Sequence, residues 1–145
     1  MNKKPKIASI DSMSETLMSG ARNVIFNSEH TDGDIYLVQG IMPEGSEVPV
    51  HIHELEDEIF HVLEGTVELI LGNETIEGNV GDIIYLPRGI KHGIKTKGTE
   101  TAKVLNYVIP GKNFENFFNE MSEKKIGVES DEGNRIAKKY GIKFL

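Results

Sequence analysis

The chain has 145 residues, 38% of them hydrophobic and 27% charged, which is enough apolar material for one compact domain and excludes collagen, low-complexity and strongly charged disordered chains. A formal net charge of −7 disfavours binding to nucleic acid or to anionic lipid surfaces. The sequence contains no cysteine, which excludes disulfides, thiol catalysis and thiolate metal ligands.

The N-terminus, Met1–Pro5, lacks the apolar stretch of a secretory signal, and no run approaches eighteen apolar residues. We therefore expect a cytoplasmic protein with neither nucleic acid nor a membrane as partner. Residues 1–34 are expected to form a strand and loop segment of the same domain, with short strands at Ile7–Ile10 and Val24–Phe26. His30 lies in a polar stretch that could mimic a calcium loop, but the alternating ligands and distal Glu of such loops are missing, so we interpret it as a surface loop.

From residue 35 to residue 109 the pattern changes to short β-rich runs that are separated by Gly, Asn, Pro or Asp. Such evenly spaced strands without helices between them favour an antiparallel sandwich or barrel. The expected strands are Ile35–Val38, Glu58–Leu63, Thr66–Leu71, Thr75–Ile76, Ile83–Leu86, His92–Thr96 and Thr101–Ile109.

The first group of residues that can carry chemistry is His51 and His53, which are two positions apart. On a strand, alternate side chains point to the same face, so both imidazoles can reach one point. Glu58 follows a polar stretch that resembles a turn and opens the next apolar strand. Two neutral imidazoles and one carboxylate form a good ligand set for a divalent first-row metal.

A second stretch, Gly81–His92, places a strand before the turn Pro87–Gly89 and His92 at the start of the next strand. Pro restricts φ and Gly permits positive φ, so this turn can reverse the chain and direct His92 inward. A set of three His and one Glu would leave one or two positions of an octahedral metal open to substrate, water or dioxygen.

Strand parity also predicts which other side chains face inward. His61 has the parity opposite to Glu58 and should face away from the metal. Glu54, Glu56 and Asp57 could support the ligands, but we interpret them as turn residues in water. Residues that share the parity of the ligands either line an apolar pocket for a small organic molecule or fill a tight core. They are Phe60, Val62, Val67, Leu69, Ile94, Thr96 and Asn106.

After Pro110 the hydrophobic period becomes helical. Phe114, Phe117, Phe118 and Met121 are spaced as one face of an amphipathic helix, which could bind a partner but which we expect to pack on its own domain. A second helix is expected from Asp131 to Tyr140, with Ser130 as N-cap and Gly141 just beyond its end. Residues 110–145 should thus form a helical tail packed on the barrel core of residues 35–109.

The two spaced patterns, Gly-x5-His-x-His-x4-Glu-x6-Gly from Gly45 to Gly65 and Gly-x5-Pro-x-Gly-x2-His from Gly81 to His92, together resemble the paired motif of the cupin superfamily. The resemblance implies an all-β jelly-roll (double-stranded β-helix) barrel of antiparallel strands. It implies one divalent transition metal per chain (Fe, Mn, Ni, Cu or Zn), bound by His51, His53, Glu58 and His92, and a homodimer.

Within the superfamily, the segments Glu56–Gly65 and Tyr85–His92 and parts of the tail are similar to quercetin dioxygenase-like cupins. The function implied is an oxygenase in which the metal binds an enol or phenol oxygen and Glu58, as catalytic residue, takes the substrate proton. A metal-dependent isomerase or lyase, and a cupin that binds metal and ligand without turnover, remain open. Thr96 departs from the Asn that often ends the second motif.

Overall fold

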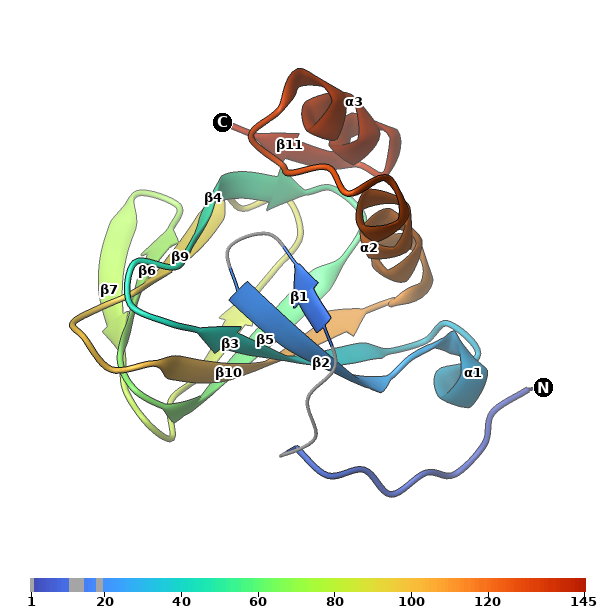
Figure 1. The fold of residues 1–145 in the computed structure, drawn as a ribbon, viewed down its shortest axis with the longest axis horizontal. Helices are drawn as coiled ribbons and strands as arrows, with labels where there is room; N and C mark the ends of the chain where they lie inside the picture. The colour runs from blue at the N-terminus through green and yellow to red at the C-terminus, as the bar shows by residue number, and fades with distance from the viewer. Residues whose placement is uncertain (1, 11–14, 18–19) are drawn as a thin grey trace.

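The computed structural model describes residues 2–10, 15–17 and 20–145. Two antiparallel sheets face each other, with strand orders β1-β2-β3-β10-β5-β8 and β11-β4-β9-β6-β7 (Figure 1). The predicted jelly-roll barrel is confirmed. The strands are β1 (Glu15–Leu17), β2 (Gly20–Phe26), β3 (Tyr36–Met42), β4 (Glu47–His53), β5 (Asp57–Glu64), β6 (Val67–Leu71), β7 (Glu74–Gly78), β8 (Ile83–Leu86), β9 (His92–Thr96), β10 (Ala102–Ile109) and β11 (Ile142–Phe144).

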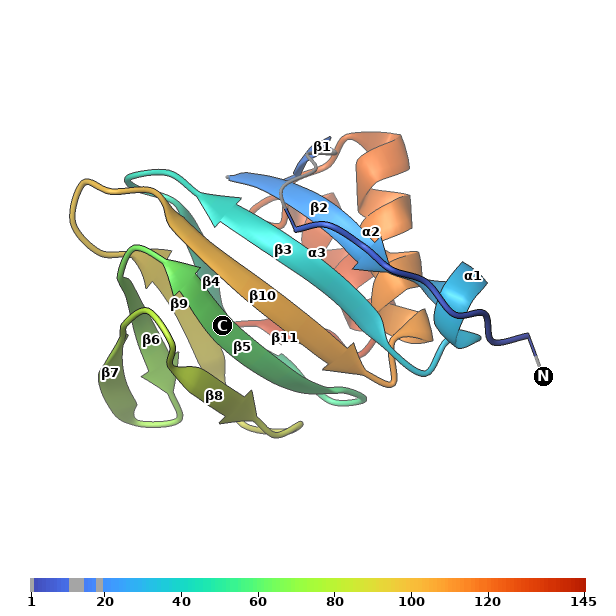
Figure 2. The ribbon, with the colours of Figure 1, turned by 90° about the horizontal axis from the view of Figure 1, so that it is seen from below.

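The strand β5 shows how the sequence pattern forms the barrel. Its buried positions are Glu58, Phe60 and Val62, and the residues between them are less buried, which is the period of two that a half-buried strand requires. Figure 2 shows β5 beside β10, and the register pairs Glu58 with Val108 and Phe60 with Asn106. Inward residues of both sheets, among them Phe60 and Val62, pack into an apolar cluster inside the barrel.

Two expectations for short segments differ from the structure, and one short strand has no counterpart among the expected elements. Residues 7–10 form no strand, and the side chain of Ile7 is 99% exposed, so it is not buried against a sheet. The polar stretch around His30 contains a one-turn helix, α1 (Ser28–Thr31), because the Asn27 side chain accepts a hydrogen bond from the Glu29 N–H as its cap. The strand β11 was not expected, since three residues are too few for a periodic pattern.

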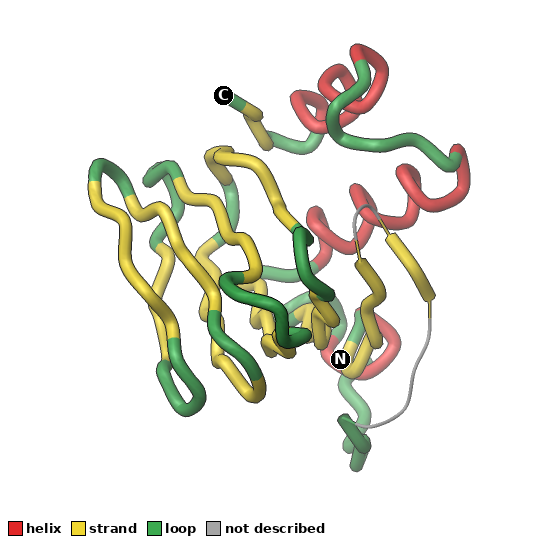
Figure 3. The backbone as a smooth tube through the Cα atoms, turned by 60° about the vertical axis from the view of Figure 1, so that its left-hand side comes forward, coloured by secondary structure: helices red, strands yellow, loops and turns green. Residues whose placement is uncertain are grey.

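The two predicted C-terminal helices are confirmed as α2 (Lys112–Lys124) and α3 (Asp131–Lys139), with Ser130 capping α3 through the Gly133 N–H. Figure 3 shows the helices gathered to one side of the strands. The apolar face of α2 is buried against β3, β10 and β11, in a cluster that includes Phe114, Phe117 and Met121. None of the helices in the described part of the chain is long and apolar enough to cross a membrane.

Candidate metal centre

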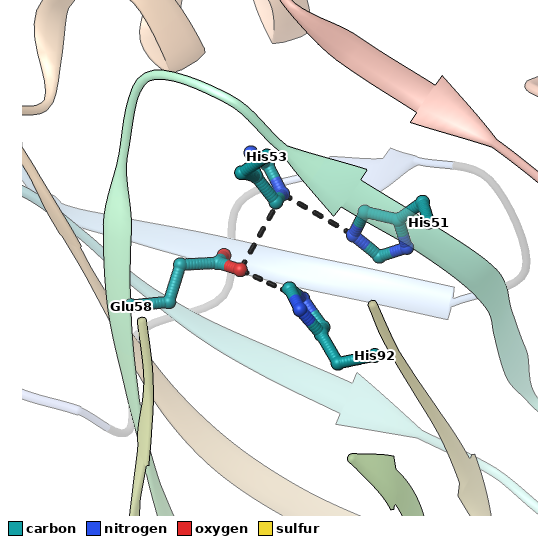
Figure 4. Close-up of side chains that lie close together, drawn as sticks. All are labelled: His51, His53, Glu58 and His92. Carbon is teal, nitrogen blue, oxygen red and sulfur yellow. Dashed lines mark hydrogen bonds and ion pairs between the residues drawn. The ribbon is translucent and has the colours of Figure 1, made fainter. Parts of the chain in front are cut away.

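Three strands direct four polar side chains to one point inside the barrel. His51 and His53 stand at the end of β4, Glu58 near the start of β5 and His92 at the start of β9, where it pairs directly with His51 (Figure 4). All four are buried, and one ligand atom from each lies within 4.8 Å of the others. The structure therefore brings together the four residues that the sequence singled out.

The separations between these atoms match the ligand shell of a single metal ion. The carboxylate oxygen Oε2 of Glu58 lies 2.8 Å from Nε2 of His92 and 3.4 Å from Nε2 of His53, and the Nε2 atoms of His51 and His53 are 3.2 Å apart. Ligands bound at roughly 2.1 Å from one ion lie about 3 Å apart when adjacent and about 4.2 Å apart when opposite. The four residues could hold a metal ion.

Hydrogen bonds on the far side of two rings leave their Nε2 atoms free for this role. Nδ1 of His51 lies 2.7 Å from the carbonyl oxygen of Pro49, to which only a protonated Nδ1 can donate. Nδ1 of His53 lies 3.2 Å from the Glu56 carboxylate, with the same consequence. Neutral rings in this tautomer direct two Nε2 lone pairs at each other, an arrangement that a cation between them relieves. The donor set therefore fits a divalent metal.

The electrostatics favour the coordinating form of two of the four residues, His51 and Glu58, whereas at His53 burial is outweighed by the carboxylates of Glu58 and Glu56, which raise its pKa. Burial lowers the pKa of His51 to about 3, with further lowering from the neighbouring His53 and His92. Burial alone would raise the pKa of Glu58, but His53 and His92 outweigh it and lower the pKa to about 2. Near neutral pH, His51 is thus a neutral imidazole and Glu58 an anionic carboxylate, which are the forms that coordinate metals.

A cavity of about 80 Å³ adjoins the four residues. Of the residues expected to line a pocket, Phe60, Ile94 and Asn106 border it. Val62, Val67 and Leu69 point inward but are fully buried in the apolar cluster, and Thr96 donates to the Met42 carbonyl over 3.0 Å. These four residues lie outside the cavity. Strand parity predicts which face of the sheet a side chain occupies, but it does not predict how far along the barrel that side chain lies. The remaining apolar lining is Val48, Phe114, Phe117, Phe118, Ile142 and Phe144.

The lining surrounds the ligands with phenyl rings. The rings of Phe114 and Phe144 lie 4.9 Å and 5.1 Å, centre to centre, from those of His53 and His51. Asn106 donates to Oε1 of Glu58 over 3.2 Å and so leaves Oε2 directed at the other ligands. Among the described residues, no Lys or Arg borders the cavity. The site therefore suits a small, mostly apolar ligand that presents an oxygen to a metal.

The acids before Glu58 differ from one another, and one of them corrects the sequence interpretation. Glu54 is exposed and pairs with Lys143, while Asp57 pairs with the half-exposed Arg88 at the surface. Glu56, however, is not a turn residue in water: it is 1% exposed and contacts His53. A turn interrupts strand parity, so sequence spacing could not reveal this inward direction.

The other two histidines lie outside the cluster. His61 points to the opposite side of β5, in register with Leu105 and Ile83. His30 lies in α1, where its Nδ1 accepts from the Asn27 N–H at 3.5 Å.

Comparison with known proteins agrees with this architecture. Residues 37–108 match the family model of the cupin domain. Quercetin 2,3-dioxygenase of Bacillus subtilis is 28% identical over 104 residues, which are 72% of this chain and 30% of that protein. An uncharacterized protein of Methanocaldococcus jannaschii is 38% identical over 69 residues, which are 48% of this chain and 55% of that protein. The chain thus spans about a third to about half of the length of these relatives.

Solved structures share the fold. A protein described as a predicted oxalate decarboxylase from Thermotoga maritima superposes with a TM-score of 0.68 at 19% identity, covering 72% of this chain and 99% of that one. KdgF from a Halomonas species gives a TM-score of 0.62 at 20% identity, covering 72% and 92%. At these identities the likeness concerns the fold alone.

Proposed function

This chain is a member of the cupin superfamily, and we propose that it binds one divalent transition metal through His51, His53, Glu58 and His92 and acts on a small organic substrate as an oxygenase. The observation that carries this proposal is the convergence of three buried imidazoles and one buried carboxylate beside a cavity. Such a metal, when bound, would supply a Lewis acid for an enol or phenol oxygen and, if redox-active, a centre for dioxygen.

The chain's own residues would position the substrate and move its proton. Glu58 is the only carboxylate on the cavity wall among the described residues, and its position makes it the group that would take the proton of an enol or phenol. Asn106 holds one oxygen of that carboxylate, which leaves the other beside His53 and His92. The phenyl rings of Phe114, Phe117 and Phe118 would exclude water from the reacting groups.

The size of the cavity constrains the substrate. An engineered protein cavity of about 150 Å³ holds benzene, and pockets for drug-sized ligands span roughly 300–1,000 Å³. With about 80 Å³ beside the ligands, this site supports a substrate far smaller than a three-ring flavonol. The likeness to quercetin 2,3-dioxygenase therefore supports the class of chemistry rather than that substrate.

Metal-dependent isomerisation or elimination is the second candidate, because three imidazoles and a carboxylate suit redox-silent zinc equally well. Dependence on dioxygen separates the two: an oxygenase loses turnover under strict anaerobiosis, and an isomerase or lyase does not. Metal binding without turnover of any substrate would leave a ligand-binding cupin.

The first test is metal content by elemental analysis on untagged wild type, His53→Ala and His61→Ala. We expect about one metal per chain in the wild type and in His61→Ala, and loss of metal in His53→Ala. Oxygen uptake by the metal-loaded protein with small enols and catechols then tests the oxygenase. If no metal is held even after reconstitution, both catalytic proposals fail.

A further inference from the structure

The turn between β4 and β5 buries a carboxylate that the ligand set does not use. The Glu56 side chain has no exposed surface, although the neighbouring Glu54 side chain is 46% exposed. Burying an unpaired carboxylate is strongly unfavourable, so a chain retains one only where its oxygens find partners. The partners of Glu56 therefore indicate its role.

Each oxygen of Glu56 has one partner. Oε1 lies 3.2 Å from Nδ1 of His53, and Oε2 accepts from Nδ2 of Asn113 over 3.1 Å. Asn113, in the first turn of α2, also donates from Nδ2 to the Tyr140 carbonyl over 2.7 Å at the end of α3. A single chain of hydrogen bonds thus runs from both C-terminal helices to the ring of one candidate ligand.

The contact falls on the nitrogen of His53 that faces away from the other ligands. Nε2 of His53 lies 3.2 Å from Nε2 of His51 and 3.4 Å from Glu58, while Nδ1 faces Glu56. A carboxylate at Nδ1 keeps the proton there, fixes the ring plane and makes Nε2 a stronger donor to a metal. Among the described residues, Nδ1 of His51 faces the backbone carbonyl of Pro49, whereas Nδ1 of His53 faces the carboxylate of Glu56.

We propose that Glu56 is a positioning residue for the metal: it orients His53 for coordination, and Asn113 couples that orientation to the docking of the C-terminal helices. This inference rests on the proposed metal site but concerns residues that are not ligands. Because this coupling is reciprocal, a bound metal stabilises the docked helices, and undocking of the helices lowers the affinity for the metal.

The test compares Zn²⁺ dissociation constants, measured by competition with a chelator, for wild type, Glu56→Gln, Glu56→Leu and Glu54→Gln. Glu56→Gln keeps an acceptor but loses the charge, and Glu56→Leu removes both at similar volume. We expect affinity to fall about 10-fold in Glu56→Gln and about 100-fold in Glu56→Leu. Glu54→Gln removes the same charge two residues away and should stay within twofold of the wild type.

A second measurement separates positioning from a general loss of stability. The visible absorption of the Co²⁺ form reports ligand geometry and should change in Glu56→Leu while it is retained in Glu54→Gln. Asn113→Ala leaves Glu56 in place, so it should lower the affinity for Zn²⁺ less than Glu56→Gln does. If Glu56→Leu fails to fold, the Zn²⁺ affinities of Glu56→Gln and Glu54→Gln are sufficient to test the proposal. Equal Zn²⁺ affinity in those two variants would overturn the proposal.

The metal-free protein provides a test that does not depend on the proposed function. The Nδ1–H proton of His53, observed by ¹H–¹⁵N NMR, should resonate far downfield in the wild type and in Glu54→Gln because it is bonded to a carboxylate. It should move upfield in Glu56→Gln and further in Glu56→Leu. If the proton shifts follow this series across the variants but the wild type binds no metal, the metal site is refuted and the orientation of His53 by Glu56 is established. An unchanged proton in all variants refutes the orientation itself.

Discussion

The buried imidazole of His51 links the candidate site to the stability of the chain. Burial lowers its pKa from 6.5 to about 3. Below pH 6.5 an unfolded chain takes up a proton at His51 that the folded chain excludes until about pH 3. The stabilising contribution is therefore complete above pH 6.5 and is lost as the pH falls toward 3, because the unfolded state binds more protons in that window.

This linkage predicts the behaviour of the metal-free protein. Between about pH 6 and pH 4, His51 should steepen the fall of the unfolding free energy by up to about 1.4 kcal/mol per pH unit. His51→Gln removes the titrating ring, so its curve should be shallower by that amount. Urea unfolding of both proteins in a chelator, at several pH values, provides the measurement. Parallel curves would show that His51 titrates equally in both states.

At the residue scale, the four candidate ligands could be predicted from the sequence, but the buried carboxylate of Glu56 that contacts His53 could not. His51 and His53 share a strand, so parity alone places both on one face, and Pro87 and Gly89 mark the turn before His92. Glu56 has no such marker, since its burial depends on Asn113 in a helix 57 positions away. Contacts across that distance come from the fold and leave no local pattern in the sequence.

At the scale of elements, the C-terminal segment completes the site. The helix α2 provides Phe114, Phe117 and Phe118 to the cavity wall, and β11 provides Ile142 and Phe144 by pairing with β4 beside His51 and His53. The helices were predictable because their apolar residues repeat over several turns. Their position over the cavity was not, because an apolar face indicates that a helix packs without indicating where.

The approach of α2 to β3 predicts the effect of a minimal substitution at Gly111. A Cβ added there would overlap the backbone N of Tyr36 and would lie 2.6 Å from the carbonyl carbon of Ile35. Gly111→Ala must therefore shift the start of α2, and overpacking of this kind costs about 1–3 kcal/mol. The shift would also carry Asn113 away from Glu56, so Zn²⁺ affinity should fall together with stability.

Urea unfolding and Zn²⁺ titration of Gly111→Ala test this expectation. Asn119→Ala is the matched control, because it adds no atom and changes an exposed position on the same helix. Its stability should stay within about 0.5 kcal/mol of the wild type, as for surface substitutions generally, and its metal affinity should not change. A Gly111→Ala protein with wild-type stability would show that α2 is not confined by β3.

At the scale of the molecule, the outer face at β8 exposes two large apolar side chains in the described part of the chain. The strand β8 forms an edge of the six-stranded sheet and exposes Ile83 by 68% and Tyr85 by 61%. Tyr85 pairs with Ile59, and Ile59 pairs with Tyr107 on β10, so these three side chains form a row on the outer face. Apolar rows on an open sheet edge commonly mark contacts between subunits.

We expect this face to form the interface of a homodimer. Light scattering after size exclusion should give twice the chain mass for the wild type, and the double variant Ile83→Lys, Tyr85→Lys should be monomeric because two desolvated charges would oppose association. The control is Ile7→Lys, since Ile7 is 99% exposed but lies outside the sheets.

Circular dichroism should show unchanged strand content in all three proteins, because Ile83 and Tyr85 contribute little to the core. The candidate ligands face the opposite side of the sheet, so the monomeric variant should still bind Zn²⁺ with wild-type affinity. A wild type that stays monomeric at micromolar concentration, or a double variant that stays dimeric, would contradict the assignment of this face.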